Sequence, residues 1–122
     1  MISRAEQEIL LAHCRKHGIW LIADDVYERL VYSPTTAHLH CAPSFLDISD
    51  RDERVISVNS FSKSWLMTGW RLGWSVWPEK IIEDITRLCV NDHSCPCAST
   101  QIAGLAALDG PHEFLDEMMS QF

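Results

Sequence analysis

The 122-residue sequence has no hydrophobic run that approaches the roughly 18 residues needed to cross a membrane. No secretory signal peptide is visible at its start. Basic residues are also few: ten lysines and arginines face seventeen acidic residues, and the basic side chains are scattered. A nucleic-acid-binding domain needs a clustered basic face. We therefore expect neither a membrane nor a nucleic acid as a partner.

Cysteines are few and odd in number, without the spacing of a disulfide framework. This pattern favours reduced thiols and a cytoplasmic location. The nearest approach to a metal motif is the C-x3-H-x-C-x-C spacing of residues 89–97, with His38, His40 and Cys41 as further candidate ligands. Attested zinc pairs have two to four intervening residues and recur. We therefore favour ordinary thiols and expect no metal. The five cysteines are Cys14, Cys41, Cys89, Cys95 and Cys97.

Helical and strand patterns alternate along the sequence. Ser3 and Glu6 form a capping box that begins a helix, and Gly18 is placed to end it. The apolar run of residues 19–23 is typical of a strand covered on both faces, as in a parallel sheet. Two more strands are expected over residues 55–59 and 72–77. After a loop over residues 33–53 with a helical turn near 44–48, we expect helices after Pro78, over 98–108 and from Pro111 to Phe122.

These elements predict an α/β fold with three layers, α/β/α, built on a short, mostly parallel sheet with covering helices. The sequence has no internal repeat and no low-complexity linker. Its length is enough for one modest domain that buries about two-thirds of its unfolded surface. Three strands make a narrow sheet, although their apolar residues need covering helices on both faces. The hydrophobic period of the last helix also continues up to Phe122. We expect a piece of a larger domain.

Polar side chains with useful chemistry follow the predicted strands. In open α/β sheets, ligands bind beyond the carboxyl ends of the strands. The first strand is followed by a carboxylate and a phenol, and the second by two hydroxyls and an amine. A guanidinium comes eight residues after the amine. These side chains belong to Asp24, Tyr27, Ser60, Ser62, Lys63 and Arg71.

This set suits a phosphorylated heteroaromatic aldehyde. A lysine amine forms a Schiff base with an aldehyde, and a carboxylate keeps a ring nitrogen protonated so that the ring accepts electrons. Hydroxyls and an arginine fork bind a phosphate. Each residue alone also has an ordinary explanation: Asp24 as a turn or cap residue, Tyr27 as a core ring, and Arg71 as half of a surface ion pair.

The combined pattern is more specific than its parts. The stretch LIADDVYERLVY resembles the Asp-Glu-Val-Tyr segment of class I and II aminotransferases, with Asp25 where glutamate is commoner. The stretch VNSFSKSWLMTGWRLGW resembles the lysine-loop signature of the same family, which has the aspartate-aminotransferase fold of pyridoxal-phosphate enzymes (fold type I). The resemblance extends over essentially all 122 residues. It implies a fragment of the large domain of such an enzyme.

The resemblance also implies a role for each site residue, with pyridoxal 5'-phosphate as the cofactor. Lys63 is the Schiff-base lysine, and its semi-apolar turn favours the neutral amine. Asp24 pairs with the pyridinium nitrogen, and Tyr27 hydrogen-bonds the ring oxygen O3′. Ser60 and Arg71 grip the phosphate, and Ser62 is a weaker candidate for the same task. The substrates implied are an amino acid and a 2-keto acid, and the intact enzyme is expected to be a homodimer.

Several parts of the family pattern are missing from residues 1–122. An Asn-Pro segment, a stacking ring and a glycine-rich phosphate turn lie upstream in the family, and a substrate-binding arginine comes from a C-terminal small domain. We therefore expect residues 1–122 to be a partial large, cofactor-binding domain that is inactive alone. Two alternatives stay open: a carbon–sulfur lyase of the same fold, and a truncated, non-catalytic interaction module. The sequence does not separate possible substrates.

Overall fold

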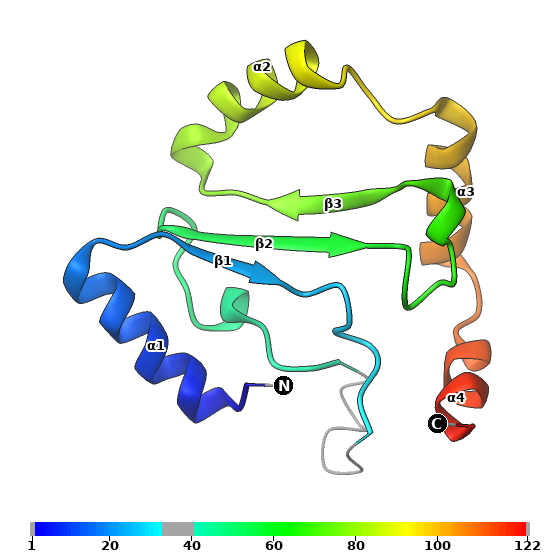
Figure 1. Cartoon of the computed structure of the whole chain (residues 1–122), viewed down its shortest axis with the longest axis horizontal. Coiled ribbons are helices and arrows are strands. Elements are labelled where there is room, and N and C mark those ends of the chain that lie inside the picture. Colours follow the sequence, from blue (N-terminus) through cyan, green and yellow to red (C-terminus); the bar gives the residue numbers. More distant parts are fainter. Residues whose placement is uncertain (1, 33–40, 122) are drawn as a thin grey trace.

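The computed structural model describes residues 2–32 and 41–121, and a small sheet lies at its centre with helices around it (Figure 1). The predicted positions His38 and His40, the loop residue Pro34 and the terminal Phe122 lie outside the described residues. In chain order the elements are α1 (Arg4–His17), β1 (Leu21–Asp24), η1 (Phe45–Asp47), β2 (Val55–Ser60), η2 (Thr68–Trp70), β3 (Gly73–Val76), η3 (Glu79–Ile81), α2 (Ile82–Asp92), α3 (Ala98–Asp109) and α4 (Glu113–Ser120).

Helix α1 begins and ends where the sequence predicts. The Ser3 N–H donates to the Glu6 carboxylate at 2.8 Å, and the Glu6 N–H donates to the Ser3 hydroxyl at 3.4 Å, so the capping box is formed. Gly18 ends the helix with a φ of 63°. That left-handed conformation suits glycine, which has no Cβ to clash with the backbone.

The three strands form one mixed sheet in the order β1-β2-β3. β1 and β2 are parallel, with Leu21 opposite Val55, whereas β3 is antiparallel to β2, with Gly73 opposite Ser60. The α/β class is confirmed, while the sheet has one antiparallel pair where a mostly parallel sheet was expected. The connection from β2 to β3 carries no crossover helix, so the chain turns back and its next strand pairs antiparallel.

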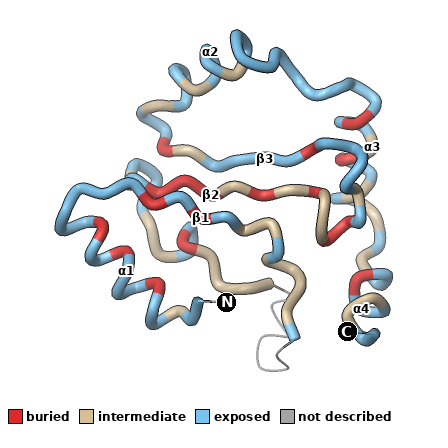
Figure 2. Tube along the Cα trace, viewed as in Figure 1, coloured by how far each residue is buried: buried red, intermediate tan, exposed pale blue. Residues whose placement is uncertain are grey.

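One hydrophobic core joins α1 to one face of β1 and β2 (Figures 1 and 2). Its residues come from the inward stripe of α1, from the strands and from η1. In β1, buried Leu21 and Ala23 alternate with exposed residues, as the period of two in a strand requires. The core residues are Leu11, Cys14, Leu21, Ala23, Phe45 and Val55.

The opposite face of β1 is open in the part of the chain that the structure describes. Ile22, which pairs with Ile56, is 68% exposed. The apolar run at residues 19–23 was expected to be covered on both faces, whereas among the described residues only the α1 side of β1 is covered.

A second core lies beside the connection between β2 and β3, where α3 packs on it. Phe61, Trp65 and Leu72 are buried there. Gly104 of α3 permits this approach, because a Cβ at that position would lie 2.5 Å from Leu72 Cδ2. In the described residues no helix is long and apolar enough to cross a membrane.

Candidate functional site

Three strand termini meet at one edge of the sheet, on the right-hand side of Figure 1. Asp24 and Ser60 are the last residues of the parallel strands β1 and β2, so both lie at this edge. β3 runs the other way and brings its first residue, Gly73, opposite Ser60. Arg71, two residues before Gly73, therefore reaches the edge from the beginning of a strand. The antiparallel pairing brings Arg71 to the edge that the carboxyl ends of β1 and β2 share.

Lys63 lies in a tight turn that directly follows β2. The Leu66 N–H donates to the Lys63 carbonyl at 3.1 Å. The neighbouring side chains of Phe61, Ser64 and Trp65 are buried, whereas Lys63 itself is half-buried. Leu66 has a φ of 54°, in the left-handed region that costs a non-glycine residue about 1–2 kcal/mol. Strained backbone of this kind is concentrated at functional sites.

The Lys63 amine faces Tyr27, which lies in the turn after β1. Lys63 Nζ is 5.7 Å from the centre of the Tyr27 ring, within the range of a cation–π contact. The Tyr27 ring is 57% exposed, so its hydroxyl is accessible to a ligand at the edge. Two residues that were predicted to share a site are therefore neighbours.

Asp24 presents its carboxylate at the same edge. The Val26 N–H lies 3.4 Å from Asp24 Oδ1, and the Asp24 side chain is exposed. Within residues 2–32 and 41–121, no hydrogen bond or ion pair joins Asp24 to Lys63 or to Arg71. Among the described residues the Asp24 carboxylate accepts only this long contact from Val26, which leaves it able to accept a hydrogen bond from a ligand.

The remaining predicted residues are held by short-range hydrogen bonds. The Ser62 N–H donates to Ser60 Oγ at 3.0 Å, and Ser60 Oγ donates to the Leu72 carbonyl at 3.2 Å. Arg71 has a φ of 52°, and its Nη1 donates to the Thr68 carbonyl at 2.9 Å. Among the described residues the other N–H groups of Arg71 have no partner, which leaves much of its fork for an anion.

Trp65 anchors the lysine turn, a role that the sequence did not reveal. Its indole N–H donates to the Ala107 carbonyl of α3 at 2.9 Å, and its ring lies 5.0 Å from that of Phe61. The Arg29 guanidinium lies 4.9 Å from the centre of the Trp65 ring. The sequence shows only that a large ring follows Lys63 by two residues. The anchoring role of Trp65 depends on its contacts with α3 and Arg29.

A hollow of about 630 Å³ lies along β1 and reaches the edge. Asp24 and Tyr27 line it, whereas Lys63, Ser60 and Arg71 do not. Glu28 also lines it, and burial raises the pKa of the Glu28 carboxyl, opposed by a hydrogen bond from Asn59. Apolar side chains form most of the remaining wall: Ile2, Leu10, Leu21, Ile22, Leu30, Val31 and Phe45.

The cysteine-rich segment does not gather into a metal centre in the part of the chain that the structure describes, where no group of three or more His, Cys, Asp or Glu side chains is placed to hold an ion. All five cysteines are free thiols. Hydrogen bonds from Ser99 and Thr100 lower the pKa of the exposed Cys97 thiol at the start of α3.

Comparison with known proteins gives one consistent result. The sequence model of the family "aminotransferase class I and II" matches residues 1–122. An aspartate aminotransferase of Rhizobium meliloti is 37% identical over 98% of this chain and 28% of its own length. One from Bacillus subtilis is 36% identical over the whole chain and 30% of its own length.

A solved structure has the same fold over nearly the whole chain. The aromatic aminotransferase from Pyrococcus horikoshii superposes with a TM-score of 0.84 at 30% identity, over 98% of this chain and 31% of that protein. The chain therefore spans less than a third of the length of these relatives.

Proposed function

Because the chain belongs to the class I and II aminotransferase family, we propose that it supplies the cofactor-binding part of an enzyme that transfers an amino group between an amino acid and a 2-keto acid. The family generally depends on pyridoxal 5'-phosphate. The observation that carries the proposal is the placement of the Lys63 amine 5.7 Å from the Tyr27 ring, at the edge where β1 and β2 end.

The side chains at the edge fit this cofactor by their chemistry. An amine is present for its aldehyde, an exposed carboxylate for its ring nitrogen, and a phenol for its ring oxygen. Arg71 has N–H groups without a partner among the described residues. Ser60 donates to the carbonyl of Leu72, the residue after Arg71, and Ser60 Oγ accepts from the Ser62 N–H. When bound, pyridoxal phosphate supplies an electron-accepting ring that stabilises negative charge on the substrate α-carbon.

Each residue would act at a defined atom. Lys63 Nζ would hold the cofactor covalently and, once released, move a proton at the substrate α-carbon. Asp24 would keep the ring nitrogen protonated, and Tyr27 would donate to the ring oxygen. Ser60 and Arg71 would bind the phosphate oxygens, with Ser62 in a lesser part.

The lengths of the relatives bear on the domain organisation. The chain covers 28–30% of two aspartate aminotransferases. From the resemblance to the family we propose that residues 1–122 are a central part of a large domain. Other parts of the enzyme, including a second copy in a homodimer, would supply substrate recognition. The five free thiols are consistent with a cytoplasmic location.

The proposal covers an amino acid and a 2-keto acid as substrate classes. Relatives named for aspartate and a structure named for aromatic substrates are similar to this chain to a comparable degree. A carbon–sulfur lyase would use the same cofactor residues, but the relatives compared above carry aminotransferase names. Amino transfer is therefore the function proposed.

The test is amino transfer by the longest protein that the gene containing these residues encodes. With pyridoxal phosphate, 2-oxoglutarate and a panel of amino acids, we expect at least one amino acid to yield glutamate and its keto acid. Lys63→Ala should abolish the reaction, and Lys80→Ala, which removes an exposed amine bonded to the Asp52 carbonyl, should not. Residues 1–122 alone should not turn over. Release of sulfide or thiol with pyruvate, without glutamate, would favour the lyase instead.

A further inference from the structure

Asp25 stands one residue past the end of β1 and is held by hydrogen bonds from three directions. Its N–H donates to the Val58 carbonyl at 2.9 Å and so extends the pairing of β1 with β2. Its carbonyl accepts from the Glu28 N–H at 2.9 Å, which closes the turn that carries Tyr27. Its Oδ2 accepts from the Ser57 hydroxyl at 2.7 Å. Ser57 is only 5% exposed, so this last bond is sheltered from water.

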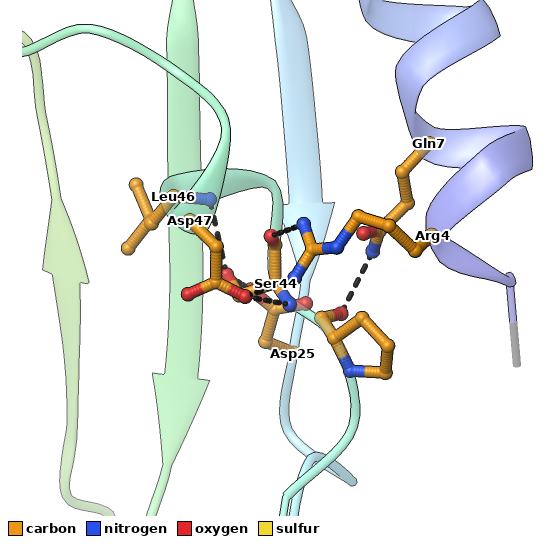
Figure 3. Close-up of polar contacts among 7 residues, drawn as sticks. Arg4, Gln7, Asp25, Ser44, Leu46 and Asp47 are labelled. Atoms are coloured by element: carbon orange, nitrogen blue, oxygen red, sulfur yellow. Dashed lines mark hydrogen bonds and ion pairs between the residues drawn. The ribbon is translucent and has the colours of Figure 1, made fainter.

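The same carboxylate also faces the segment that leads into η1 (Figure 3). The Ser44 hydroxyl lies 3.4 Å from Asp25 Oδ2. Helix α1 holds that segment in place, because Arg4 Nη1 donates to the Ser44 carbonyl at 2.9 Å and Gln7 Nε2 donates to the Pro43 carbonyl at 2.7 Å. Asp25 is therefore the point where β1, β2 and the α1-bound segment are joined.

Asp24 and Asp25 lie on opposite faces of the sheet. Ala23 is buried on the α1 side and is paired with Ser57, whereas Asp24 is paired with Val58 and is exposed. Successive side chains of a strand alternate between faces, and Asp25 returns to the face of Ser57. The Asp25 carboxylate, bonded to Ser57, therefore lies on the α1 face of the sheet, and the Asp24 carboxylate lies on the opposite face.

We propose that Asp25 is a positioning residue that fixes the direction of the Asp24 carboxylate through its bond to Ser57. The inference rests on the proposed function, in which Asp24 pairs with the nitrogen of the cofactor ring. Among the described residues, only a long contact from Val26 orients the Asp24 side chain. The direction of its carboxylate therefore depends on how firmly the end of β1 is held against β2. The side chain of the next residue, bonded to a buried hydroxyl, supplies that restraint.

The experiment compares two ligands that differ only at the atom that Asp24 would contact. One is pyridoxal phosphate, and the other is its analogue with carbon in place of the ring nitrogen. Dissociation constants for both are measured with the longest encoded protein and with Asp25→Ala, Ser57→Ala and Asp24→Ala. We expect the unsubstituted protein to prefer pyridoxal phosphate, and Asp25→Ala and Ser57→Ala to reduce that preference roughly tenfold. The affinity for the analogue should change by less than about twofold.

Three further variants separate positioning from general stability. Asp25→Glu keeps a carboxylate and should retain most of the preference. Leu11→Ala weakens the α1 core without touching Asp25 and should leave the preference unchanged. Ser75→Ala removes a hydroxyl that accepts from Trp77 at 2.7 Å and should also leave it unchanged. Asp25→Ala removes a partly buried group, so circular dichroism must show that each variant is folded. If Asp25→Ala does not fold, Ser57→Ala provides the test.

The outcomes are distinguishable. If Asp25→Ala and Ser57→Ala weaken both ligands equally, Asp25 is only a structural anchor and the inference is wrong. A double variant no weaker than either single variant supports it, because the two residues then act as one unit. If the unsubstituted protein shows no preference, or Asp24→Ala does not remove it, the role of Asp24 itself is wrong and the proposal about Asp25 falls with it.

Discussion

Lys63 Nζ lies 5.7 Å from the centre of the Tyr27 ring, so the amine and the phenol proposed to hold one cofactor are neighbours. Tyr27→Phe keeps the ring and removes only the hydroxyl. Because Tyr27 is 57% exposed, the fold should persist, while cofactor affinity should fall roughly tenfold through loss of a bond to a charged oxygen. Fluorescence titration with pyridoxal phosphate measures this. Tyr32→Phe, at the other tyrosine, is the control, and an equal loss there would argue against a specific role for Tyr27.

Replacing Asp24 tests the assignment of the ring-nitrogen partner. Asp24→Ala should leave the ring nitrogen unprotonated and cost roughly 3–5 kcal/mol of interaction if the bound ring shields the pair from water. We expect transaminase activity of the full enzyme to fall by at least about a hundredfold. The exposed Asp109 provides a matched control as Asp109→Ala. Near-native activity in Asp24→Ala would show that another group protonates the ring.

Gly73 is needed where β3 begins. A Cβ there would lie 2.5 Å from the Asn59 carbonyl oxygen, and a backbone atom cannot move aside cheaply. Gly73→Ala should therefore lower the free energy of unfolding by about 1–3 kcal/mol. Gly69→Ala is the control, since nothing lies within 4 Å of a Cβ at that position. Urea denaturation compares the two, and equal stabilities would mean that β3 pairs with β2 in another way.

The pair Arg15 and Glu53 predicts a pH-dependent contribution to stability. Arg15 Nη2 donates to Glu53 Oε2 at 2.7 Å, and this hydrogen bonding lowers the pKa of the Glu53 carboxyl. A lowered carboxyl pKa means that the stabilisation is present above the unfolded-state pKa and is lost as the pH falls through the folded-state pKa. Glu53→Gln should thus cost about 0.5 kcal/mol at pH 7 and nothing in strong acid.

Thermal unfolding as a function of pH measures this difference between Glu53→Gln and the unsubstituted protein. Glu83→Gln removes a largely exposed partner of Arg87, at 3.6 Å, and should show little change in stability at any pH. A Glu53→Gln effect of the same size in acid and at neutrality would mean that the side chain acts by packing rather than by charge.

Local signals in the sequence predicted the elements around the site well. Ser3, Glu6 and Gly18 delimit α1 because caps depend on residues close in sequence. Strand β2 was expected over residues 55–59 and extends over Val55–Ser60. The semi-apolar surroundings of Lys63 could also be predicted, because Phe61 and Trp65, both buried, flank the lysine in the sequence itself.

Features that depend on tertiary contacts could not be predicted from the sequence. The antiparallel direction of β3 follows from the path of the chain between Lys63 and Arg71. Hydrophobic periodicity predicts a strand but not the direction in which it pairs. The roles of Trp65 and Asp25 depend on partners far away in the chain, the Ala107 carbonyl and the Ser57 hydroxyl. The exposure of Ile22 also departs from its apolar pattern, because a run of hydrophobic residues indicates what a strand can bury and not what covers it.

The most direct test of the central claim is the identity of the lysine that binds the cofactor. The longest encoded protein is incubated with pyridoxal phosphate, reduced with borohydride and digested, and the modified peptide is identified by mass spectrometry. The chain has three lysines, and Lys16 at the end of α1 and Lys80, bonded to the Asp52 carbonyl, serve as internal controls. We predict stoichiometric pyridoxyl label on Lys63 alone. Label mainly on Lys16 or Lys80, with Lys63 unmodified, would contradict the assignment of this edge of the sheet as the cofactor site.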